Sequence, residues 1–158
     1  MNKLTMKDSI GNWTRQVHTF LEGISTAAKE DDWHTTFSEC NVSEEPSGVG
    51  ASLTYTIPVL ELSRALSNGS AQRITFEPRY RFAIGATGRI DVYSHPASRE
   101  AMLLRSSNVE DPESQTWEEL EALIGKAPWR AFSTERLPLD VDFNSKPSVR
   151  RFLSDLVA

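Results

Sequence analysis

The segment from Arg73 to Arg105 constrains the fold more than any other part of this chain, because apolar and polar residues alternate along its first half. The even positions from Ile74 to Ile84 are apolar, aromatic or proline, whereas the odd positions include arginines, Thr75 and Glu77. Side chains of a β-strand point alternately to the two faces of a sheet, so one face is expected to be core and the other solvated. Pro78 is expected to bend this long strand.

A second strand pattern, from Arg89 to Ser94, follows the glycine-bracketed loop at 85–88. A phosphate-binding glycine loop would open a helix, whereas this loop is followed by a strand, so its glycines indicate a turn that needs positive φ. We therefore expect an antiparallel hairpin with Phe82 opposite Val92. A one-residue slip would turn Asp91 toward the core.

Helical patterns are expected at both ends of the chain. Apolar residues from Ile10 to Ala28 recur every three or four positions, and the acidic run at 30–32 ends that pattern. Asn144 or Ser145 is expected to start a C-terminal helix. Further strands are expected at 33–42, 53–59, 101–104 and 129–139, and a short helix at 116–124.

These patterns predict a single α+β domain over residues 1–158, in which an antiparallel sheet of about five strands carries the N- and C-terminal helices on one face. A net charge of −5 argues against a general nucleic-acid or anionic-membrane binder. The single cysteine, Cys40, excludes an intramolecular disulfide. With no signal-like or membrane-spanning apolar run, we expect a cytoplasmic protein.

Arginines dominate the charge of the central block and predict a locally positive sheet face. They outnumber the carboxylates of Glu77, Asp91 and Glu100, and they are Arg73, Arg79, Arg81, Arg89, Arg99 and Arg105. Solvation alone explains such a face. The functional interpretation is a binding surface for an acidic protein or peptide, or for a second copy of the chain.

We expect this binding surface to consist of Arg79, Arg81, Arg89 and Tyr93. The hairpin pairing above places Arg81 beside Tyr93 and diagonal to Asp91, as an ion-pair partner on the solvated face. Nucleic acid is not expected as a partner, because the other aromatic side chains of this hairpin point toward the core and are not free to stack on bases.

A metal-dependent hydrolase or nuclease-like enzyme is the alternative interpretation. Its first candidate residues are Asp91, Glu100, Glu77 and His95. The strand after Asp91 lacks the carboxylate and lysine that nucleases of this kind place there. No histidine pair has metal-ligand spacing, and no nucleophile motif such as Gly-x-Ser-x-Gly occurs. We therefore expect no metal and no cofactor.

Three runs, 74–78, 85–93 and 102–105, resemble a loosely defined group of small uncharacterised bacterial proteins with a Glu-Pro … Gly-Ala-x-Gly-Arg-[Ile/Val]-Asp pattern. The resemblance covers about the central third of the chain and, more loosely, its C-terminal helix. It implies a bacterial origin, a cytoplasmic location and a sheet core. It carries over no activity and no site. The chain departs from this pattern at 108–125, where acidic residues accumulate.

Together these observations predict a non-catalytic interaction or accessory protein that uses an arginine-bearing sheet face, with a protein as its partner. The enzyme centred on Asp91 remains the rival hypothesis. Clustering of Asp91 with two further carboxylates or a histidine in a cleft would favour the rival.

Overall fold

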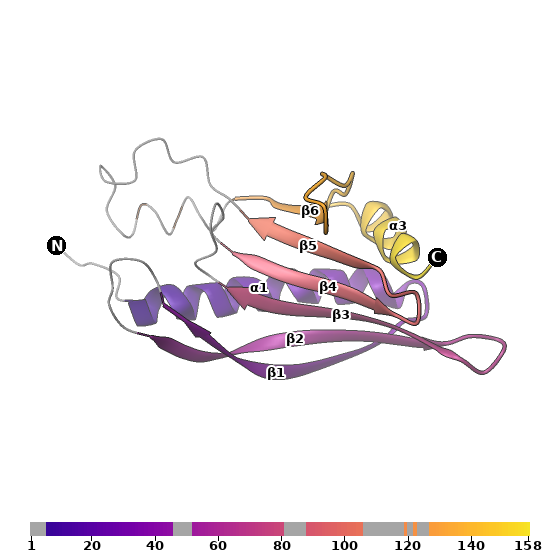
Figure 1. The fold of residues 1–158 in the computed structure, drawn as a ribbon, viewed down its shortest axis with the longest axis horizontal. Helices are drawn as coiled ribbons and strands as arrows, with labels where there is room; N and C mark the ends of the chain where they lie inside the picture. The colour runs from indigo at the N-terminus through magenta and orange to yellow at the C-terminus, as the bar shows by residue number, and fades with distance from the viewer. Residues whose placement is uncertain (1–5, 46–51, 81–87, 106–118, 120–121, 123–126) are drawn as a thin grey trace.

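The computed structural model describes residues 6–45, 52–80, 88–105, 119, 122 and 127–158. Its elements are α1 (Met6–Lys29), β1 (His34–Glu44), β2 (Leu53–Ala65), β3 (Ala71–Tyr80), β4 (Arg89–His95), β5 (Glu100–Arg105), β6 (Trp129–Ser133) and α3 (Lys146–Val157). The six strands form one antiparallel sheet in sequence order (Figure 1). The α+β class is confirmed, with six strands where about five were expected.

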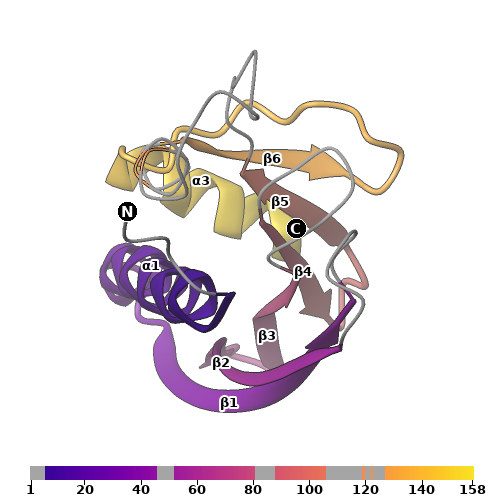
Figure 2. The same cartoon turned by 90° about the vertical axis from the view of Figure 1, so that its left-hand side faces the viewer.

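Both helices lie on one side of the sheet, as predicted. Figure 1 looks onto the sheet with α1 passing behind the strands. Turned by 90°, the sheet curves partly around α1 and α3 (Figure 2). The two helices contact each other, α1 packs on β1 and β2, and α3 packs on β3 and β4. We call the face toward the helices the inner face and the opposite face the outer face.

The core lies between the helices and the inner face. On α1 the buried residues recur every three or four positions and confirm the apolar stripe: Trp13, Val17, Leu21, Ile24 and Ala28. The strands meet this stripe with Leu60, Leu62, Ile74, Phe76, Ile90, Val92 and Leu103, and α3 adds Val149, Phe152, Leu153 and Leu156. Each large apolar side chain buried in this way contributes about 1.5–3 kcal/mol.

The predicted pairing of the β3–β4 hairpin is wrong by six residues. Phe76, and not Phe82, lies opposite Val92, and the described pairing extends to Tyr80 and Arg89. Alternation has a period of two, so every even shift keeps the same residues on the same faces, and the apolar pattern cannot distinguish between them. The error arose from assuming a tight turn at 85–88.

Pro58 lies in β2 where that strand has a single neighbour. Strand β2 pairs with β1 from Leu53 to Ser63, but its described pairing with β3 begins only at Leu60. Because proline has no N–H to donate, this local edge accommodates it. The buried positions change parity there, from Ile57 to Leu60, without a break in pairing with β1.

The end of α1 is tied to α3 by an ion pair. Arg150 donates from Nη2 to Asp31 Oδ1 at 2.6 Å and from Nε to Oδ2 at 2.9 Å. This hydrogen bonding lowers the pKa of the Asp31 carboxyl below its ordinary value and raises that of the Arg150 guanidinium. Lys146 lies 3.4 Å from Glu30 in the same group.

Arg105 is buried on the inner face, contrary to its place among the expected surface arginines. The residue is 2% exposed and its guanidinium lies against two tryptophans, with Cζ 5.2 Å from the ring centroid of Trp13 and 5.5 Å from that of Trp129. It also donates to Gln16 Oε1. Gly88 completes this cluster, because a Cβ there would meet Trp13.

Some expectations fall outside the described residues. The helix expected at 116–124 is described only at Glu119 and Ala122, and the structure does not describe Arg81, Phe82 or the glycine loop at 85–88 before Gly88. The last strand ends at Ser133 and not at residue 139. Among the described residues, no helix has the length and apolarity needed to span a membrane.

Candidate functional site

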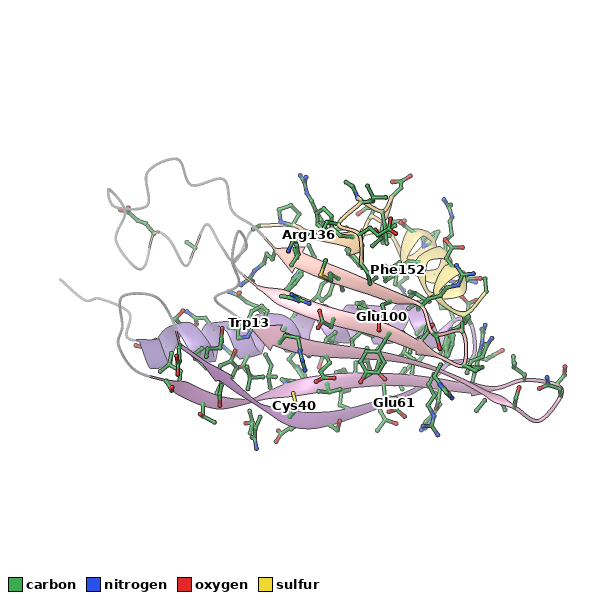
Figure 3. The ribbon with its side chains drawn as sticks, viewed as in Figure 1. Trp13, Cys40, Glu61, Glu100, Arg136 and Phe152 are labelled. Carbon is green, nitrogen blue, oxygen red and sulfur yellow. The ribbon has the colours of Figure 1, made fainter. Side chains whose placement is uncertain are left out.

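A hollow of about 400 Å³ lies on the outer face, over β3, β4 and β5. We call it the outer-face hollow. Its charged lining residues are Glu77, Arg79, Arg89, Asp91 and Glu100, and they are joined by Tyr93, Met102 and Thr134. Glu100 is labelled in Figure 3 at the start of β5.

Strand alternation brings these side chains together. In β3 the even residues Ile74 and Phe76 are buried, which leaves Glu77 and its odd neighbours on the outer face. Cross-strand pairing then places Asp91 opposite both Glu77 on β3 and Met102 on β5. The centre of the hollow is therefore a row of three paired strands with no helix above it in the described part of the chain.

The carboxylates of Glu77 on β3 and Asp91 on β4 lie directly opposite each other. Their repulsion would destabilise the strand pair if no positive charge lay between them. Arg79 joins them: its Nη1 donates to Glu77 Oε1 at 2.7 Å and its Nε lies 3.5 Å from Asp91 Oδ2. Arg89 Nε donates to Asp91 Oδ1 at 2.8 Å. Both Asp91 oxygens thus face guanidinium groups, and the carboxylate pair is neutralised from two sides.

Tyr93 on β4 also belongs to this network. Its hydroxyl donates to Glu77 Oε2 at 3.1 Å, while 41% of the residue remains exposed. Partial burial, followed by the hydrogen bond and the negative charge of Glu77, raises the pKa of the Tyr93 hydroxyl above its ordinary value. The hydroxyl is therefore protonated at neutral pH, and the ring presents an aromatic surface to solvent.

A smaller hollow of about 150 Å³ adjoins the first and shares Glu77 and Arg79 with it. Cys40 lines this smaller hollow, half-buried. Burial, with a smaller contribution from Glu77, raises the pKa of the Cys40 thiol, although Arg79 acts in the opposite direction. Because the thiolate is the nucleophilic form, this environment does not activate the cysteine.

The structure unites residues that the sequence divided between two hypotheses. The proposed binding residues Arg79, Arg89 and Tyr93 line the same hollow as the proposed catalytic residues. Those catalytic candidates are Asp91, Glu100 and Glu77. His95 does not line the hollow; it is the last residue of β4 and pairs with Arg73.

Sequence reasoning missed Met102 and Thr134. Met102 shares the parity of Glu100 in β5, so alternation could have placed it on the outer face. Thr134 follows the end of β6, where no pattern indicated which strand it would approach. Alternation could also have identified Arg105 as an inward residue, because it shares the parity of the buried Leu103.

The charge of the hollow differs from the prediction. The lining residues that the structure describes include three carboxylates and two arginines, a formal charge of −1 for this described part, where the arginine count predicted an excess of positive charge. Among the described residues, no group of three or more histidine, cysteine, aspartate or glutamate side chains is placed to hold a metal ion. The hollow does gather Asp91 with Glu77 and Glu100, the clustering that was named as favouring the rival enzyme, but guanidinium groups of Arg79 and Arg89 lie against both oxygens of Asp91.

Comparison with known protein families, with curated proteins and with solved structures found no match to this chain. The resemblance carried by the runs at 74–78, 85–93 and 102–105 stays a prediction.

Proposed function

We propose that this chain is a non-catalytic, cytoplasmic interaction protein that binds another protein through the outer-face hollow. The observation that carries this proposal is the composition of the hollow. Tyrosine, arginine and methionine are the residue types enriched at the centres of protein interfaces, and Tyr93, Arg89 and Met102 lie here on neighbouring strands. A partly exposed aromatic ring beside a paired charge network is a typical anchor for a partner side chain.

The polar groups of the hollow also favour binding over catalysis. Asp91 accepts from Arg89 and lies beside Arg79, and Glu77 accepts from Arg79 and Tyr93. A general base or a metal ligand needs a lone pair that can reach the reacting group, whereas these carboxylates are occupied by their neighbours. They hold one another in fixed positions, which suits recognition of a matching surface.

Cross-linking from the hollow tests the proposal. A photo-cross-linking amino acid in place of Met102 is expected to give one discrete protein adduct in cells of the source organism. The same amino acid in place of Thr26, exposed on α1, is expected to give none. Tyr93→Ala should abolish the Met102 adduct. Phe37→Ala removes an aromatic residue of similar exposure, 39% against 41%, outside the hollow, and should leave the adduct intact.

Either of two results would overturn the proposal: no adduct from Met102, or an adduct that survives Tyr93→Ala. An adduct with the mass of two copies of this chain would support it, with a homo-oligomer as the complex. The rival enzyme centred on Asp91 has its own test. Mg²⁺ or Mn²⁺ that binds the folded protein must raise its melting temperature, so an unchanged temperature argues against that enzyme.

A further inference from the structure

We infer that the outer-face hollow receives a basic side chain, an arginine or lysine of the partner protein, which the Glu100 carboxylate binds against the exposed ring of Tyr93. This inference rests on the proposed function and names the group that the hollow recognises. It reverses the sign of the partner that the arginine-rich sequence suggested.

The distribution of ion pairs carries the inference. Both arginines of the hollow are turned toward carboxylates of the same hollow: Arg79 toward Glu77 and Asp91, and Arg89 toward Asp91. Glu100 lines the hollow too, yet its carboxylate forms no ion pair or hydrogen bond with another described residue. The one carboxylate left over accounts for the formal charge of −1, and it sits at a defined position on β5.

The surroundings of Glu100 suit a cation that is carried on a long apolar stem. Tyr93 is its direct cross-strand partner and is 41% exposed, so a cation bound to the carboxylate can also lie over the aromatic face. Met102, the next outward residue of β5, offers a flexible thioether against which the methylene groups of lysine or arginine can pack.

Size and charge narrow the choice of occupant. Ligand sites span about 300–1,000 Å³, so a hollow of about 400 Å³ has room for one long side chain. A phosphate or carboxylate group would meet a net negative lining whose guanidinium groups are engaged already. The complementary group is therefore cationic, and a protein supplies it as lysine or arginine.

Three short peptides test the inference on the intact chain: N-acetyl-Gly-Arg-Gly-amide and its Gln and Glu analogues. We expect the Arg peptide alone to shift the backbone amide resonances of residues 91–93 and 100–102 saturably, with a dissociation constant in the millimolar range. Added NaCl should weaken this binding, because partly exposed charges are screened.

Glu100→Gln should weaken the Arg peptide about threefold or more, as expected for the loss of one partly exposed ion pair. The matched control is Glu61→Gln, which removes the same charge from an outward residue of β2 that does not line the hollow (Figure 3). Its affinity for the peptide should equal that of the wild-type chain. The inference is overturned by preferential binding of the Glu peptide, by the absence of a saturable shift, or by equal losses in the two variants.

The two proposals fail separately. A Met102 adduct that depends on Tyr93, together with no binding of the Arg peptide, would leave a protein-binding hollow and overturn only the basic side chain as its ligand. Peptide binding without any adduct would overturn the protein partner and leave the hollow as a site for a basic group.

Discussion

Gly88 offers the sharpest test of the packing described above, because the structure allows almost no side chain there. A Cβ on Gly88 would lie 2.6 Å from Trp13 Cζ3, 2.8 Å from Trp13 Cη2 and 3.3 Å from Trp129 Cη2. Ordinary carbon contacts are about 3.5–4.0 Å, so the first two overlap by close to 1 Å. Trp13 is fully buried, so its ring can move only by displacing packed neighbours.

Gly88→Ala should therefore destabilise the fold by about 1–3 kcal/mol, the usual range for one extra methyl group in a packed core. For a domain of this length, each kcal/mol lowers the melting temperature by about 2–4 °C, so a loss of about 2–12 °C is expected. Urea unfolding measures the same change as a lower midpoint with an unchanged slope.

The matched control is Gly23→Ala on the exposed side of α1, where a Cβ would meet no atom within 4 Å. Alanine is a better helix former than glycine by about 0.5–1 kcal/mol, so this substitution should stabilise the protein. The same substitution, glycine to alanine, is thus expected to stabilise the protein at Gly23 and to destabilise it at Gly88. A neutral or stabilising Gly88→Ala would refute the close contact with Trp13.

A double mutant separates steric overlap from a backbone effect. Trp13→Phe removes about three buried heavy atoms and should itself cost about 2 kcal/mol, at ~0.8 kcal/mol per methylene-sized group. It also opens the space that the Gly88 methyl group needs. In that background Gly88→Ala should cost almost nothing, and a cost as large as in the wild-type chain would refute steric overlap as the cause.

Three further outcomes follow from named contacts. Arg150 lowers the pKa of the Asp31 carboxyl below 3.8, so the stability that this ion pair gives to the fold is complete above that pH and is lost as the pH falls below it. Asp31→Asn should therefore lower the urea midpoint at pH 7 more than at pH 3, and equal losses at the two pH values would contradict this. Glu77→Gln should lower the pKa of Tyr93 toward 10.0 in an ultraviolet titration, and an unchanged titration would exclude Glu77 as a cause. The Ser145 side chain accepts from a backbone N–H of the first turn of α3, so Ser145→Ala should cost about 1 kcal/mol in urea unfolding, whereas Ser145→Asp should retain the cap.

The parts of the fold that were predictable from sequence are those determined by local periodicity. The stripe along α1 and the alternation along β3 each repeat the geometry of one element, and both kinds of face were assigned correctly. The register of β3 against β4 depends on loop length as well, and alternation does not distinguish registers that differ by an even number of residues. Register was therefore the first prediction to fail.

In the candidate site, too, the residue types were predictable from the sequence, whereas their contacts were not. Each of its charged residues was singled out from the sequence, but as members of competing sets. The contact of Arg79 with Asp91 depends on the register of β3 against β4, which alternation could not provide. The predicted register had named Arg81 as the ion-pair partner of Asp91. The net charge of the hollow likewise depends on which arginines face outward. Arg105, counted with the others, is buried against two tryptophans.

The pairing of Glu77 with Asp91 is the strongest reason to regard this hollow as more than a solvated face. Like charges directly opposite in a sheet are destabilising by a few tenths of a kcal/mol to about 1 kcal/mol, and exposed ion pairs return a similar amount. Two carboxylates and two arginines therefore add little net stability to strands that uncharged β-branched residues would serve equally well. Local rules that a sequence breaks without a gain in stability are expected at functional sites. By this reasoning the network is expected to hold the ring of Tyr93, through its hydrogen bond to Glu77, in position for the proposed partner.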